Sequence, residues 1–173
     1  PLQGAAQADE ALSRVHARRF AVGEWRAGSL APRLDAQRIV AAGHSYGANT
    51  VLLASGANVL REGRSMPLRD PRIKAAIVLS APPFYGEAQP QRILGAVDVP
   101  SLHVTATEDI IRIPGYYSGA DDRVAVYEAT GGSRKTLAVF EGGSHSMFTD
   151  RAGTGGPELN PRVKLATQEL TLA

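Results

Sequence analysis

The sequence contains no cysteine, and this absence removes several classes of chemistry at once. A disulfide scaffold, a thiolate zinc site, an iron–sulfur cluster and a cysteine nucleophile are all excluded. Lysine is also scarce, because only Lys74, Lys135 and Lys164 stand among the 19 basic residues. The basic residues are scattered and the net charge is only +2, so the pattern does not favour nucleic acid as a partner.

Long hydrophobic runs are missing too. No apolar stretch approaches the roughly 18 residues of a membrane-spanning helix, so we expect no membrane partner. Residues 1–10 lack the apolar centre of a signal peptide. Hydrophobic residues nevertheless make up 43% of the 173 residues, which is typical of a globular chain. We therefore expect residues 1–173 to form a single domain.

Short apolar runs bounded by turn residues are present, and they predict β-strands. They start about 28–35 residues apart, a spacing that suits βαβ units and not hairpins. Helical patterns fill the intervals at residues 8–19, 48–60 and 120–129 and from residue 160 to the end. The four predicted strands are Arg38–Ala42, Ile73–Ser80, Ser101–Ala106 and Thr136–Phe140.

This alternation predicts an α/β fold, with a mostly parallel sheet and helices on both faces. Asn160 and Pro161 predict the start of the last helix, as N-cap and first helical residue. Residues 81–97 are too few for a large lid domain, so we expect an open cleft. In open α/β sheets, ligands bind beyond the carboxyl ends of the strands, so reactive side chains are expected there.

The pentapeptide Gly43-His44-Ser45-Tyr46-Gly47 follows the first predicted strand and precedes a predicted helix. In this context a G-x-S-x-G sequence forms a tight turn that presents the serine hydroxyl above the sheet. Flanking glycines allow the backbone segments to approach each other. Ser45 is therefore the candidate nucleophile, and the backbone N–H of Tyr46 is a candidate donor to an oxyanion.

Two acidic residues, Glu108 and Asp109, follow the third predicted strand. A carboxylate at this end of the sheet is positioned to orient a histidine and to stabilise its imidazolium. Asp109 is the preferred candidate and Glu108 remains the alternative. Asp98 precedes the same strand and so lies at the wrong end of it.

The chain has four histidines, and His145 alone follows both the candidate acid and a strand. The glycine pair 142–143 predicts a flexible turn that brings His145 back over the sheet as the general base. His16 is expected on an exposed helix, and His103 lies within a predicted strand. His44, inside the pentapeptide, is expected to pack or to form a hydrogen bond.

These motifs resemble the α/β-hydrolase superfamily, and within it the dienelactone-hydrolase-like and polyester-hydrolase-like serine esterases. The resemblance runs from about Leu34 to Phe148 and implies the chain order serine, acid, histidine. Dienelactone hydrolases proper carry a cysteine nucleophile, and the serine here favours ester chemistry. The residues that carry the resemblance are Gly43–Gly47, Val99-Pro100 with Asp109, and Gly142–His145.

The resemblance also implies strands before the pentapeptide, yet only 44 residues precede Ser45. We therefore expect the C-terminal portion of a longer hydrolase domain, or strands supplied by another segment. The first predicted strand would then be an exposed sheet edge, through which we expect self-association. The second oxyanion donor, beside Tyr46, is expected from the absent part.

The sequence thus predicts a serine hydrolase that cleaves a small-molecule or polymeric ester through an acyl-enzyme intermediate, with no metal or organic cofactor. An acyltransferase with the same triad is one alternative. A catalytically impaired hydrolase-fold fragment or binding domain is the other. Aromatic residues on the predicted loops either line a substrate pocket or cap the core; these are Phe84, Tyr85, Tyr116, Tyr117 and Phe148.

Overall fold

A four-stranded parallel sheet forms the centre of the molecule. The computed structural model describes residues 13–17, 20–25, 27–29, 31–33, 35–61, 63–66, 68–84, 88–149 and 158–173. The strands lie in the order β1-β4-β5-β8 and match the four apolar runs. They are β1 (Ile39–His44), β4 (Ile73–Leu79), β5 (Ser101–Glu108) and β8 (Lys135–Ser144).

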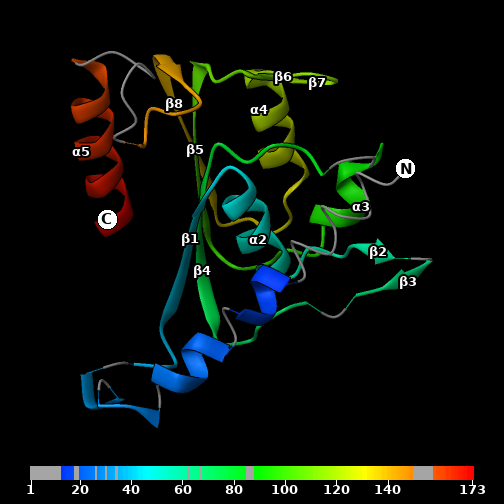
Figure 1. The fold of residues 1–173 in the computed structure, drawn as a ribbon, viewed down its shortest axis with the longest axis vertical. Coiled ribbons are helices and arrows are strands. Elements are labelled where there is room, and N and C mark those ends of the chain that lie inside the picture. Colours follow the sequence, from blue (N-terminus) through cyan, green and yellow to red (C-terminus); the bar gives the residue numbers. More distant parts are fainter. Residues whose placement is uncertain are drawn as a thin grey trace.

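Helices lie on both sides of this sheet, as predicted. Figure 1 shows α2, α3 and α4 on one side and α5 on the other. Residues 13–17 and 20–25 are also helical, and a short 3₁₀ turn, η1 (Ala31–Arg33), precedes β1. The helices are α2 (Tyr46–Ser55), α3 (Pro90–Leu94), α4 (Ala120–Ala129) and α5 (Leu159–Leu172).

Two small antiparallel hairpins and helix α3 are additions that the sequence patterns did not predict. Strands of two or three residues and a five-residue helix are too short to show a hydrophobic period. The hairpins are β2 (Leu60–Arg61) with β3 (Arg64–Ser65), and β6 (Ile111–Ile113) with β7 (Tyr116–Ser118).

Helix α2 ends at Ser55, whereas the sequence predicted that it would continue to Leu60. The reason is Gly56, which has a φ of 124° and leaves the helical conformation. Its N–H donates to the carbonyl of Leu53 at 3.2 Å, and the N–H of Ala57 donates to that of Leu52 at 2.9 Å. This pair of bonds satisfies the last carbonyls and closes the helix.

The main core lies between α2 and the sheet. Helix α2 is buried from Ala48 to Ser55 and contacts both β1 and β4. Its apolar side chains pack against alternate residues of the strands, including Ala41, Ala76 and Val78. A smaller cluster of Ala106, Met147 and Val163 joins α5 to the end of the sheet. The two clusters fix the carboxyl ends of the strands relative to α2.

The glycine pair of β8 does not form the flexible turn that the sequence predicted. Strand β8 continues through both glycines to Ser144, with an irregularity in its pairing to β5. Gly142 has a φ of 72°, and a Cβ on Gly143 would lie 2.4 Å from the sulfur of Met147. The pair therefore forms a bulge that is packed tightly at Gly143 and open at Gly142, and the strand continues through it to Ser144.

The start of α5 also differs from the prediction. The N-cap is Glu158, and Asn160 and Pro161 both lie inside the first turn. Proline is tolerated in that turn because the first N–H groups of a helix have no intrahelical partner.

Within the described residues, no large lid domain separates the strands, and the β4–β5 connection carries α3. Among those same residues, no helix is long and apolar enough to cross a membrane.

Candidate active site

Three chemically reactive side chains meet at the carboxyl edge of the sheet. Ser45 follows β1, Asp109 follows β5 and His145 follows β8. Because these strands are parallel, their carboxyl ends lie on one side of the molecule. Residues separated by up to 100 positions in the sequence are thereby brought into contact.

Ser45 sits on a strained turn between β1 and α2. Its φ of 56° places a non-glycine residue in the left-handed region, which is uncommon and occurs often at active sites. Its N–H donates to the carbonyl of Leu79 at 2.9 Å, so the turn is tied to the neighbouring strand.

The two glycines that flank this turn are not equivalent. A Cβ on Gly43 would lie 2.3 Å from the carbonyl oxygen of Gly47, so this close approach requires glycine. A Cβ on Gly47 would meet nothing within 4 Å. The expectation that both glycines relieve a clash therefore holds for Gly43 and is wrong for Gly47.

A continuous hydrogen-bonded chain joins the three side chains. The Nε2 atom of His145 lies 2.9 Å from Ser45 Oγ, and its Nδ1 atom lies 2.7 Å from Asp109 Oδ1. Both distances are ordinary hydrogen-bond lengths. The side chain of Asp109 is fully buried, whereas that of His145 is 17% exposed. The acid end of this hydrogen-bonded chain is therefore shielded from solvent, whereas the imidazole is partly accessible.

The ionisation of Asp109 determines the direction of these bonds. Burial by itself raises the pKa of Asp109, but the hydrogen bond from His145 and the nearby Ser80 hydroxyl outweigh it. The charge of Arg123 and the Thr105 hydroxyl act in the same sense, and the pKa falls to about 2. Asp109 is therefore a carboxylate near neutral pH.

A carboxylate can only accept hydrogen bonds, so Nδ1 of His145 must carry the proton that it shares with Asp109. The lone pair of Nε2 then faces Ser45 and accepts a hydrogen bond from its hydroxyl. In this tautomer the imidazole is ready to remove a proton from Ser45.

His44 supports the backbone of His145. Its Nε2–H donates to the carbonyl of His145 at 2.7 Å, and the two ring centroids are 4.8 Å apart. Burial lowers the pKa of His44, although the bond to that carbonyl opposes the shift. A neutral His44 ring keeps a second positive charge away from the imidazole of His145.

Of the two candidate acids, Asp109 contacts His145 and Glu108 does not. Glu108 is exposed at the end of β5. The other two histidines lie where the sequence indicated, with His16 exposed and His103 buried within β5.

The predicted substrate-contacting aromatics are placed in different surroundings. Phe148 lies beside the site, with its ring centroid 5.7 Å from that of His44. Phe84 packs against the main core. Tyr116 and Tyr117 form strand β7, where the exposed Tyr117 ring lies under the guanidinium of Arg112 at 5.6 Å. Tyr85 lies outside the described residues.

Two residues that hold Asp109 were not identified from the sequence. Thr105 donates to Asp109 Oδ2 at 2.8 Å, and Arg123 Nε lies 3.4 Å from Oδ1. Thr105 stands four residues before the acid in a strand that also contains Ser101, His103 and Thr107, so its hydroxyl gives no distinct signal. Arg123 comes from α4, and no sequence pattern connects that helix with the site.

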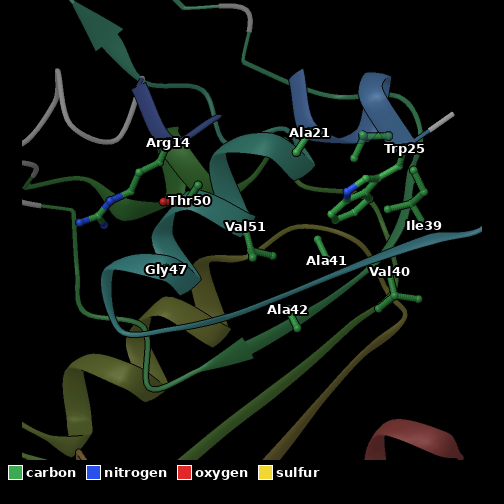
Figure 2. Close-up of a pocket in the computed structure, with 11 residues that line it drawn as sticks. Arg14, Ala21, Trp25, Ile39, Val40, Ala41, Ala42, Gly47, Thr50 and Val51 are labelled. Carbon is green, nitrogen blue, oxygen red and sulfur yellow. The ribbon is translucent and has the colours of Figure 1, made fainter. Parts of the chain in front are cut away.

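A separate apolar cleft of about 400 Å³ lies along β1, and none of the three reactive side chains lines it. Trp25 from the N-terminal helical segment and Val51 of α2 line it together with Val40 and Ala41 (Figure 2). This cleft follows the outer edge of the sheet along β1. The reactive side chains lie instead at the carboxyl ends of the strands.

The described residues contain no cluster of three or more histidine or acidic side chains that would hold a metal ion. The site combines a hydroxyl, an imidazole and a buried carboxylate. These three groups are suited to proton transfer and nucleophilic attack.

No protein-family model matches the sequence, and no curated protein matches it. Solved structures do match. The chain is similar to Thermogutta terrifontis esterase 2 phosphoramylated by tabun, with a TM-score of 0.63 and 19% identity over 94% of this chain and 64% of that one. The butyrate-bound form of that esterase has a TM-score of 0.59 at 19% identity, over 91% and 64% of the two chains.

A protein described as a dienelactone hydrolase from Klebsiella pneumoniae is also similar, with a TM-score of 0.57 and 16% identity over 81% of this chain and 54% of that one. The chain thus spans 54% to 64% of the length of these three structures. At this level of identity the likeness establishes only that the chain shares the α/β fold of these esterase and dienelactone-hydrolase structures.

Proposed function

We propose that this protein is a serine hydrolase that cleaves carboxylic esters, with Ser45, His145 and Asp109 as its catalytic triad. The observation that carries the proposal is the unbroken chain of hydrogen bonds from Ser45 Oγ through His145 to Asp109. The position of Ser45 at a strained strand-to-helix turn supports the same assignment. The solved esterases with the same fold make ester chemistry the leading class.

In the proposed mechanism, His145 Nε2 accepts the proton of Ser45 as Oγ attacks the ester carbonyl. The backbone N–H of Tyr46, at the first residue of α2, donates to the developing oxyanion. His145 then protonates the leaving alcohol, and an ester bond joins the acyl group to Ser45. Water, activated by His145, hydrolyses that ester and restores the free hydroxyl.

Asp109 stabilises the imidazolium that forms during each proton transfer. Its full burial strengthens the interaction, because few water molecules screen the charge. The mechanism uses no metal or organic cofactor.

We also propose that residues 1–173 act as one domain. The proposed substrates are small-molecule or polymeric esters. The similar esterase 2 has been solved in a butyrate-bound form, which supports a short acyl chain as a first probe. Phe148 is the aromatic nearest the triad and is the strongest candidate for substrate contact. Phe84, Tyr116 and Tyr117 remain candidates for substrate contact, and so does Tyr85, which lies outside the described residues.

Covalent labelling of the serine tests this proposal. A fluorophosphonate should add one label to the intact chain, as measured by mass spectrometry, and Ser45→Ala should abolish the label. Hydrolysis of p-nitrophenyl butyrate should fall by roughly 10⁴-fold in the same variant. Ser133→Ala, which alters an exposed serine, is the matched control and should behave as wild type.

A folded wild-type chain that takes up no label and cleaves no ester would refute the proposal. Label that persists in Ser45→Ala would assign the nucleophile to another residue. Addition of an alcohol to the assay separates an esterase from an acyltransferase, because only the latter forms mainly the new ester.

A further inference from the structure

A buried arginine lies beneath the proposed triad and has no part in the mechanism above. Arg123 comes from α4, and its side chain is only 1% exposed. Its Nε donates to Asp109 Oδ1 at 3.4 Å, and this is the oxygen that accepts from His145 Nδ1. One carboxylate oxygen is therefore in contact with both an imidazole and a guanidinium.

The same guanidinium reaches a second point of the chain. Its Nη1 donates to the hydroxyl of Ser118, and that hydroxyl donates to Asp122 Oδ2 at 2.7 Å. Asp122 Oδ2 also accepts from the N–H of Gly119 at 3.0 Å, at the start of α4. The network is buried at Arg123 and Ser118, where its hydrogen bonds are shielded from water.

Asp109 lies two residues before β6, and Ser118 is the last residue of β7, so the two residues stand at the two ends of the β6–β7 hairpin. The ten-residue segment from Asp109 to Ser118 therefore leaves the sheet and turns back. The side chain of Arg123 contacts both of its ends. A guanidinium suits this position, because its planar fork binds two acceptors at fixed angles, which an ammonium group does not. Figure 1 shows the β6–β7 hairpin beside one end of α4.

We infer that Arg123 is a positioning residue that clamps both ends of the β6–β7 hairpin and so holds Asp109 in place for His145. This role rests on the proposed function. Arg123 acts in two ways, through the geometry of its fork and through its charge. The positive charge of the guanidinium makes the Asp109–His145 pair bind an added proton less tightly, because it stabilises the carboxylate form of Asp109.

The other groups that face the pair do not duplicate this charge. His44 approaches His145 from β1, and burial lowers the pKa of His44, which favours its neutral form. Thr105 and Ser80 contribute uncharged hydroxyls from β5 and the end of β4. Removal of Arg123 would therefore leave a buried carboxylate with only neutral donors and the imidazole around it.

Three variants separate charge from geometry. Arg123→Met removes both, Arg123→Lys keeps the charge without the fork, and Ser118→Ala removes one anchor of the fork. The rate of fluorophosphonate labelling is measured from pH 4 to pH 9. Arg134→Met, which removes an exposed arginine, is the control for loss of one positive charge.

We expect Arg123→Met to move the acid-side midpoint of the rate profile upward by about one pH unit, since the pair then binds a proton more tightly. In Arg123→Lys and Ser118→Ala the midpoint should stay, while the plateau rate falls roughly tenfold or more because the acid is less well positioned. Arg134→Met should keep both quantities unchanged. A purely structural role would lower stability without moving the midpoint.

The proton shared by His145 Nδ1 and Asp109 provides a readout that does not depend on activity. Such a proton resonates far downfield in the ¹H NMR spectrum, and we expect it to shift or broaden in Arg123→Met. A folded Arg123→Met with wild-type midpoint and resonance would overturn the inference. If that variant fails to fold, wild-type rates and resonance in both Arg123→Lys and Ser118→Ala would overturn it.

The two proposals fail in different ways. A wild-type chain that shows the resonance but takes up no label would refute the hydrolase function alone. The clamp would then be judged on the resonance of the variants.

Discussion

At the scale of single residues, the site depends on a few backbone positions that tolerate little change. The turn at Ser45 combines a positive φ with the close approach of Gly43 to the carbonyl of Gly47. The G-x-S-x-G pattern indicated this turn but treated its glycines alike. Only the packing of the two segments reveals that the first glycine is sterically required and the second is not.

Alanine at each glycine tests this asymmetry. Gly43→Ala should destabilise the fold by about 1–3 kcal/mol, because its Cβ overlaps the Gly47 backbone. Gly47→Ala should be neutral or stabilising by up to about 1 kcal/mol, because alanine favours the helix and its Cβ meets open space. Urea denaturation at pH 7 measures both values. Equal losses in the two variants would show that the turn is not packed in this way.

At the scale of elements, the contact between β5 and α4 illustrates how much a strand pattern leaves open. The apolar run 101–106 predicted the strand, and His103 within it was assigned to core or face without a partner. In the fold, His103 is 3% exposed and its ring meets Tyr127 of α4 edge-on, with centroids 5.4 Å apart. Burial, with a smaller effect from the charge of Lys135, lowers the pKa of His103 to about 4.

This shift predicts a loss of stability in mild acid. The folded protein binds the His103 proton less tightly than the unfolded chain, whose histidine has its usual pKa near 6.5. The stabilisation is thus fully present above pH 6.5 and is lost as the pH falls from 6.5 to 4. Between pH 7.5 and pH 4.5 the loss amounts to about 2 kcal/mol.

Urea denaturation at those two pH values measures the loss. His103→Phe, which keeps a ring against Tyr127, should reduce it, whereas substitution of the exposed His16 by alanine should not. An unchanged loss in His103→Phe would assign the acid sensitivity to other groups. The contribution of Asp109 is distinguishable, because its lowered pKa of about 2 places its loss below pH 3.8.

At the scale of the whole molecule, the outer edge of the sheet stands out. Strand β1 has one hydrogen-bonded neighbour, β4, and among the described residues no strand pairs with its other side. Val40 of this strand is 55% exposed, and the apolar cleft beside it includes Trp25 (Figure 2). An apolar edge strand of this kind is a template for pairing with another strand.

We propose that this edge mediates self-association at high protein concentration. Sedimentation velocity at increasing concentration should show a larger species whose fraction falls in Val40→Lys, because a charge on an edge strand opposes pairing. Val139→Lys is the matched control, since Val139 is 48% exposed on β8 at the opposite edge. A monomer at every concentration, or an equal effect of both variants, would contradict the proposal.

The sequence by itself determined the parallel sheet and the candidates for its reactive edge. Buried parallel strands carry continuous apolar runs, and Ser45, Asp109 and His145 each follow such a run within a few residues. These signals are local, because each depends on neighbours within a few positions.

Only the tertiary structure decided how those residues are held. The choice of Asp109 over Glu108, the bulge at Gly142 and the clamp by Arg123 all depend on contacts between elements that lie far apart in the sequence. Such contacts leave no periodicity in the chain, since each involves one side chain and one partner. They arise when the strands align and the buried polar groups must find partners away from water.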